Sequence, residues 1–267
     1  METFLVGKLP CDIVSRQDFA SLCARWLQRV SHENTCRHIV TLNPEMVVEA
    51  QHNDAFARAV MEADIRVPDG AGIIWAHWYM RSSSWQLLPS LMAFSLHSVE
   101  RITGVEAIDT LADLATQGQA SMYLLGGTRH QREYTKRYLE GRYPTITIYV
   151  SPDHVFDLSG PKIILEDIQQ KKPDILCVAY GAPKQSTWIA QHRLDLPSVK
   201  IAIGVGGALA ILSEEKPRAP LFLRRHNMEW LWRLILEPAR ARRIWRAVVE
   251  FPALVYRQKK KISIPIT

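Results

Sequence analysis

Three times in its second half, the chain repeats one unit: an apolar segment, a glycine turn and a helical pattern. The apolar segments span residues 122–125, 175–179 and 201–203. Further apolar segments that precede helical patterns are at residues 39–40, 65–67 and 146–150. Alternating strands and helices are typical of α/β proteins, in which crossover helices leave neighbouring strands parallel. The sequence therefore predicts an α/β fold with a Rossmann-like, largely parallel sheet and helices on both faces.

Glycines follow these strands at positions where a ligand could approach the backbone. Gly204 and Gly206 come directly after residues 201–203 and precede a helix, whose N-terminus favours phosphate. The run lacks the third glycine of the dinucleotide fingerprint, and there is no Walker lysine motif. We therefore expect an anion-binding loop and no nicotinamide, flavin or other cofactor.

Polar residues end the first two strands, where α/β proteins bind their ligands. Thr41 and Asn43 can donate and accept hydrogen bonds without charge, whereas Asp69 can accept a proton or bind a hydroxyl. Pro44 suits the first turn of a helix. Asn-Pro and Pro-Asp-Gly are also common at helix starts and turns, and motif chemistry alone does not separate that interpretation from a site.

Positive charge is concentrated at the C-terminus of the chain. The net charge is +6, yet residues 216–267 hold 13 Lys and Arg against 3 Glu, and the remaining residues are mildly acidic. This shift predicts an α/β body at residues 1–215 and a basic helical appendage at residues 216–267. A segregated basic segment indicates an anionic partner, such as lipid headgroups, phosphates or nucleic acid. The lysines at 259–261 are expected to fray.

A series of motifs, in order along the chain, closely resembles the WecG/TagA/CpsF family of bacterial glycosyltransferases. The resemblance covers most of the chain between residues 10 and 246. Its motifs are Thr41-Leu42-Asn43-Pro44-Glu45-Met46, Ala63-Asp64, Pro68-Asp69-Gly70-x-Gly72, Trp75-Ala76, Arg101-Ile102-Thr103-Gly104, Leu124-Leu125-Gly126-Gly127, Gly181-Ala182-Pro183-Lys184-Gln185, Gly204-Val205-Gly206, Arg218-Ala219-Pro220, Glu229-Trp230-Leu231-Trp232-Arg233 and Glu237-Pro238.

The resemblance implies sugar transfer from a UDP-sugar to a polyprenyl-diphosphate-linked saccharide, in the synthesis of surface polysaccharides or wall polymers. The enzyme would then be cytoplasmic and peripheral on the inner face of the cell membrane. Asp69 matches the aspartate proposed as general base. The other matched residues line the sugar pocket (Thr41, Asn43, Arg101, Gln185) or close over the diphosphate (Arg233, Arg240, Arg243). Ser186 stands where the family usually carries Glu, which puts the donor sugar in doubt.

The chemistry expected of such an enzyme has to proceed without the usual metal motif. No Asp-x-Asp pair occurs in the chain, so no metal site is predicted and the leaving diphosphate needs cations and helix dipoles. Arg233, Arg240 and Arg243 are seven and ten residues apart, which on one continuous helix places them within about 80° of each other. We therefore expect an inverting, metal-independent transferase.

Some alternatives stay open at this stage. A non-catalytic adaptor that binds membrane or nucleic acid through its basic appendage is the main rival, although no nucleic-acid motif is present and lipid fits better. No apolar run reaches the roughly 18 residues of a spanning helix. Residues 81–100 fit either a buried loop or a lip at the membrane interface, and self-association into a homo-oligomer is open. The four cysteines lack metal or disulfide spacing and are expected to be reduced.

Overall fold

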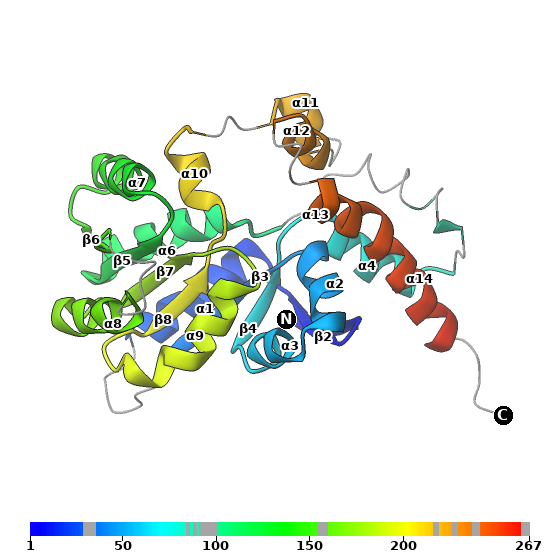
Figure 1. Cartoon of the computed structure of the whole chain (residues 1–267), viewed down its shortest axis with the longest axis horizontal. Coiled ribbons are helices and arrows are strands. Elements are labelled where there is room, and N and C mark those ends of the chain that lie inside the picture. Colours follow the sequence, from blue (N-terminus) through cyan, green and yellow to red (C-terminus); the bar gives the residue numbers. More distant parts are fainter. Residues whose placement is uncertain are drawn as a thin grey trace.

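The computed structural model describes residues 1–28, 36–83, 86–87, 90, 101–153, 160–215, 219–225, 229–236 and 241–262. Within these ranges, six parallel strands form one sheet in the order β4-β3-β8-β7-β5-β6 (Figure 1). The strands are β3 (Arg37–Leu42), β4 (Ile65–Pro68), β5 (Ser121–Gly126), β6 (Thr147–Val150), β7 (Ile175–Ala179) and β8 (Ile201–Gly204). The predicted α/β fold with a parallel sheet is confirmed.

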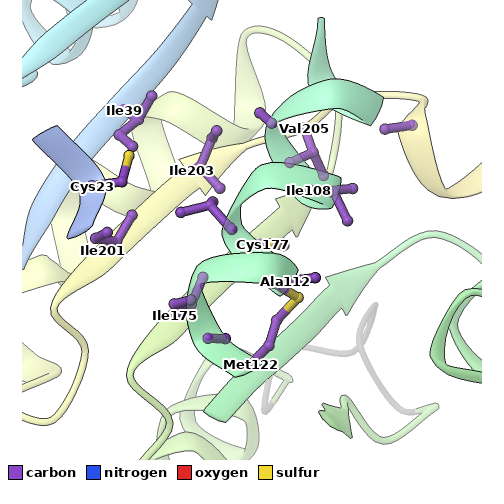
Figure 2. Close-up of a cluster of buried hydrophobic side chains, with 14 of the residues drawn as sticks. Cys23, Ile39, Ile108, Ala112, Met122, Ile175, Cys177, Ile201, Ile203 and Val205 are labelled. Atoms are coloured by element: carbon purple, nitrogen blue, oxygen red, sulfur yellow. The ribbon is translucent and has the colours of Figure 1, made fainter. Parts of the chain in front are cut away.

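One face of the sheet packs on α1 (Arg16–Gln28) and α6 (Gly104–Gly118). Figure 2 shows this core, in which side chains from four strands meet Cys23 of α1 and Ile108 of α6. The strand residues labelled there are Ile39, Met122, Ile175, Cys177, Ile201 and Ile203. These apolar side chains, spaced two apart along β7 and β8, come from one side of each pleated strand.

The alternate residues of the same strands are also apolar and face the other layer of helices. Leu176 and Ala202 pack with Ile168 of α8 (Gly160–Lys171) and Ile189 of α9 (Lys184–His192). Next to them lie α2 (Pro44–His52), α3 (Asp54–Met61) and α4 (Ala71–Arg81), which share a core with β3. Apolar side chains on both faces explain why the central strands read as continuous apolar runs.

The four cysteines are free and buried, as expected from their spacing. Burial raises the pKa of Cys23, Cys36 and Cys177 to about 12. Their thiols are therefore neutral at physiological pH and behave as small apolar groups of the core.

An N-terminal hairpin covers the β4 side of the sheet. Its strands β1 (Glu2–Val6) and β2 (Leu9–Ile13) pair antiparallel, and β2 packs against β4. Asp12 is buried there, and its Oδ2 accepts hydrogen bonds from the Arg66 backbone nitrogen and Nη2, both at 2.9 Å. This buried ion pair links the hairpin to the sheet edge.

The basic C-terminal region consists of two parts. The helices α11 (Leu221–Arg225) and α12 (Glu229–Leu236) contact each other, whereas the last helix, α14 (Phe251–Ile262), packs against α2 and α4. Phe251 and Val255 of α14 are fully buried in the core formed with α2 and α4. The division of the chain at residue 215 stays a prediction, but α14 belongs to the core of the body.

Both ends of the α11–α12 segment are fastened to the body. Before it, Glu215 follows α10 (Ala208–Leu212) and accepts a hydrogen bond from Gln131 in the first turn of α7 (Arg129–Arg142). This hydrogen bond holds the pKa of the Glu215 carboxyl below its ordinary value. After it, α13 (Ala241–Trp245) and a π-helix (Arg246–Glu250) lead into α14. No helix in the described ranges is long and apolar enough to cross a membrane.

The expectation that residues 259–261 fray is wrong for Lys259, which is buried. Its Nζ donates hydrogen bonds at 2.7 Å to the backbone oxygens of Tyr79 and Ser82, at the C-terminal end of α4. The same nitrogen lies 4.2 Å from the centroid of the Tyr79 ring. A cation at a helix C-terminus binds the last carbonyl groups and interacts favourably with the helix dipole, which explains why this lysine is ordered.

We predict that replacing Lys259 by Met lowers the free energy of unfolding by about 1–3 kcal/mol, because the α4 carbonyls lose their buried donor. Lys260 is exposed and provides a matched control, for which replacement by Met should change stability by less than about 0.5 kcal/mol. Urea unfolding of both variants measures the difference. Equal effects at the two positions would contradict the capping role of Lys259.

Candidate active site

The carboxyl ends of four adjacent strands bring most of the predicted site residues to one edge of the sheet. Leu42 of β3 pairs with Pro68 of β4, and Val40 of β3 pairs with Gly204 of β8. Gly204 pairs on its other side with Val178 of β7. Thr41, Asn43, Asp69 and Gly206 are in these strands or within two residues of their ends, and Gln185 is in the first turn of α9, which follows β7. Parallel register therefore gathers them at one edge.

Thr41 contacts the last residue of β8, and Gln185 contacts the glycine loop that follows it. The Thr41 hydroxyl is buried and donates a hydrogen bond to the Gly204 oxygen at 3.0 Å. The Gln185 side chain, 3% exposed, accepts a hydrogen bond at Oε1 from the Gly206 backbone nitrogen at 2.9 Å. Two elements thus hold the glycine loop in place. The direct contacts of these residues with a sugar stay a prediction.

The two glycines of the loop meet different requirements. A Cβ on Gly204 would lie 2.5 Å from Gln185 Nε2, so only glycine allows the amide to pack there. Gly206 has φ +55 and adopts a backbone conformation that side chains disfavour. The N-terminus of α6 also approaches this loop, because a Cβ on Gly104 would lie 2.7 Å from the Val205 oxygen.

Asn43 and Asp69 lie at the ends of β3 and β4. Asn43 caps α2 through Oδ1, which accepts a hydrogen bond from the Met46 nitrogen at 3.0 Å. The Asp69 nitrogen donates to the Leu42 oxygen at 2.7 Å, which fixes the backbone that carries its half-buried carboxylate. Asn43 thus has the structural role of a helix cap, and its amide nitrogen makes no hydrogen bond within the described part of the chain.

Arg101 is close in the fold to Asp69, although 32 residues separate them in the sequence. The next residue, Ile102, donates its backbone hydrogen bond to the Pro68 oxygen at 3.2 Å. Thr103 then caps α6 in a capping box with Glu106. Arg101 is half-buried at this junction, so its predicted place beside the site is consistent with the geometry.

The three predicted arginines are described to different extents. Arg240 lies outside the described residues, and so does the side chain of Arg233, whose backbone belongs to α12. Arg243 of α13 forms an ion pair with Glu45 in the first turn of α2. That contact places Arg243 close to Asn43, at the same edge of the sheet.

A second group of residues lies after β5 and was missed by the sequence analysis. Arg132 is buried, and its Nη1 donates to the Gly127 oxygen at 2.9 Å and, more weakly, to the Gly126 oxygen. Its Nη2 donates to Asp153 Oδ1 at 2.7 Å. A buried arginine in a helix has no distinctive sequence signal, because the same residue on an exposed helix face looks identical in the sequence.

Arg132 holds a loop at the point where the strand order of the sheet reverses. The neighbouring strands β5 and β7 are followed by connections that run in opposite directions, to β6 and to β8. Sheets of α/β proteins bind their ligands at such switch points. Gly126 and Gly127 have φ +89 and +66 there. Burial raises the pKa of the neighbouring Tyr180 to about 12, so its phenol is a hydrogen-bond donor and not a base at neutral pH.

Ser186, which departs from the family pattern, is not exposed at this edge of the sheet. Its side chain is fully buried, and its hydroxyl has no hydrogen-bond partner in the described part of the chain. A direct effect of this position on sugar selectivity would need a contact that a fully buried side chain cannot make. Among the described residues, no group of three or more His, Cys, Asp or Glu is arranged to hold a metal ion.

We predict that Gly204→Ala destabilises the protein by about 1–3 kcal/mol, because its methyl group would overlap Gln185. In a Gln185→Ala background the added cost should fall below about 0.5 kcal/mol, which a double-mutant cycle of urea unfolding measures. Gly207→Ala is the matched control, since a Cβ there meets no atom within 4 Å. An unchanged cost in the Gln185→Ala background would contradict the packing argument.

Comparison with known proteins agrees with the motifs at this edge. Residues 4–264 match the model described as the glycosyl transferase WecG/TagA/CpsF family. Two similar proteins are the N-acetylglucosaminyldiphosphoundecaprenol N-acetyl-beta-D-mannosaminyltransferases of Staphylococcus aureus strains MRSA252 and NCTC 8325 / PS 47. Each is 31% identical over 225 residues, which cover 84% of this chain and 82% of the relative. The chain therefore belongs to the WecG/TagA/CpsF family and is a glycosyltransferase.

Proposed function

We propose that this enzyme transfers a sugar from a UDP-sugar to a saccharide linked to polyprenyl diphosphate. The names of the relatives give N-acetylmannosamine as the transferred sugar and a lipid-diphosphate-linked N-acetylglucosamine as the acceptor. We propose the same sugar and the same acceptor for this enzyme. The observation that carries the proposal is the placement of Asp69 beside Thr41, Asn43 and the Gln185-braced glycine loop. This edge combines a proton acceptor with a preorganised glycine loop and with the Asn43 amide nitrogen, which is suited to a sugar hydroxyl.

In the proposed reaction, Asp69 accepts the proton of the acceptor hydroxyl as that oxygen attacks the anomeric carbon. The bond between the anomeric carbon and the diphosphate oxygen breaks on the opposite face, and UDP leaves. One displacement inverts the anomeric configuration. Tyr180 keeps its proton at neutral pH, so the carboxylate is the better base at this edge of the sheet.

Charge on the departing diphosphate would be stabilised by protein groups. Backbone amides of the glycine loops and the first turn of α7 offer partial positive charge, and Arg132 keeps the loop after β5 in its left-handed conformation. Arg243 adds a guanidinium at the start of α2, where its charge is shared with Glu45. Arg233 and Arg240 are assigned the same role by the family resemblance alone.

We also propose that the enzyme works on the inner face of the cell membrane, where a lipid-linked acceptor would be found. Leu221 and Phe222 of α11 and Ile235 of α12 are 61–65% exposed in a region of strong positive charge. Exposed apolar groups among basic residues suit the interface of an anionic bilayer. Docking would therefore involve α11 and α12, while α14 stays in the core.

The general base is tested by Asp69→Asn, which keeps the size of the side chain and removes the proton acceptor. We expect the transfer rate to fall about 100-fold or more. The assay follows UDP release from UDP-N-acetylmannosamine with a lipid-diphosphate-linked N-acetylglucosamine acceptor. Asp113→Asn, on an exposed part of α6, is the control and should leave the rate unchanged. Near-normal transfer by folded Asp69→Asn would eliminate this base.

Metal independence gives a separate prediction. Because protein cations and helix N-termini are proposed to hold the diphosphate, transfer rates with and without EDTA should agree within about twofold. The measurement is the same UDP-release assay after exhaustive chelation. Loss of transfer that added magnesium or manganese restores would mean that a metal ion binds the diphosphate.

A further inference from the structure

Two ion pairs join α2 to the C-terminal helices, and they differ in position and geometry. Arg243 pairs with Glu45, and Arg246 pairs with Glu49 at 2.7 Å. Building on the proposed function, we infer that Glu45 is a positioning residue, which holds the Arg243 guanidinium at the site for the donor diphosphate. Glu49 and Arg246 fasten the helices to each other without a role in catalysis.

The position of each pair along α2 separates their roles. Glu45 follows Pro44 in the first turn of the helix, two residues after Asn43 at the end of β3. Glu49 lies one turn farther from the sheet edge, where it also accepts a hydrogen bond from Asn53. Only the first pair therefore lies at the edge that carries the predicted catalytic groups.

The geometry of Arg243 leaves its phosphate-binding side available. Its hydrogen bond to Glu45 is made by Nε, and its two terminal nitrogens make no other hydrogen bond in the described ranges. The side chain is 40% exposed, compared with 25% for Arg246, which uses a terminal nitrogen for its own carboxylate. A guanidinium held through Nε presents the remaining nitrogens, which can bind phosphate oxygens in pairs.

The C-terminal helices have other anchors, so loss of Glu45 should not release them. Phe251 and Val255 are buried in the core, and Phe251 packs edge-on against Trp75 with ring centroids 6.4 Å apart. Farther along α14, Gln258 exchanges hydrogen bonds with the backbones of Leu5 and Gly7. A Glu45 variant should therefore lose orientation of one guanidinium and keep the docked helix.

The first experiment compares Glu45→Gln with the matched control Glu49→Gln in the full chain, with UDP-N-acetylmannosamine as donor. We expect Glu45→Gln to lower kcat/KM about 10-fold, mainly through a higher KM for the donor and weaker inhibition by UDP. Glu49→Gln should stay within about twofold, while both variants melt at similar temperatures. Equal kinetic effects in the two variants would overturn the inference.

The second experiment exchanges the charges of each pair. The exchange Glu49→Arg with Arg246→Glu should restore the transfer lost by Glu49→Arg alone, because only the attraction matters. The exchange Glu45→Arg with Arg243→Glu should restore the melting temperature lost by Glu45→Arg alone. Its transfer rate should stay about 10-fold or more below that of the unmodified protein. Full recovery of transfer in that variant would mean that Arg243 is another fastening residue.

The two proposals fail in different ways. If Arg243→Ala impairs transfer while Glu45→Gln does not, the positioning role of Glu45 is wrong and the proposed function stands. If the unmodified protein releases no UDP from any UDP-sugar with a lipid-linked acceptor, the proposed function itself is wrong. In that case the ion pairs are contacts between helices only.

Discussion

Parallel hydrogen-bonded register among β4, β3, β8 and β7 is the constraint on which the rest of the site depends. It brings residues from positions 41 to 206 to one edge, because every strand ends on the same side of the sheet. Both faces of the central strands are apolar, but each face packs on different helices, α1 and α6 on one side and α8 and α9 on the other, so a shift of one residue would move every side chain into the wrong core. A mutation in the central strands can therefore disturb catalysis without touching a substrate.

Some side chains at this edge of the sheet form hydrogen bonds to the backbone, and others remain available to contact a substrate. Thr41 and Gln185 direct polar atoms at the loop after β8, and Asn43 caps a helix with its side-chain oxygen. Resemblance to a family shows that such residues matter, but it does not distinguish a sugar contact from a backbone contact. Interatomic distances are needed to distinguish the two. Here they indicate that part of the role expected in sugar binding is instead to preorganise the glycine loop.

The alternation of apolar runs and glycine turns was sufficient to predict the α/β class and the strands of the parallel sheet. The strand β2 was harder to predict, because Pro10 interrupts its pattern and it pairs only within a hairpin. The burial of Arg132 and Lys259 could not be read from the sequence either. Both are basic residues in helices. Arg132 is held inside by the carbonyl oxygens of the glycine turn just before its helix and by the Asp153 carboxylate, and Lys259 is held by carbonyl oxygens of the distant helix α4.

The fastening of Glu215 to α7 and of Arg243 to α2 changes how the exposed helices relate to the domain. Glu215 and Arg243 are both held by the body and α14 packs in its core, so α11 and α12 lie between two anchored segments of the chain. Shortening the chain from its end would remove core residues before it reached α11 and α12. If α11 and α12 dock on a membrane as proposed, their links to α7 and α2 would also orient the candidate active site relative to that membrane.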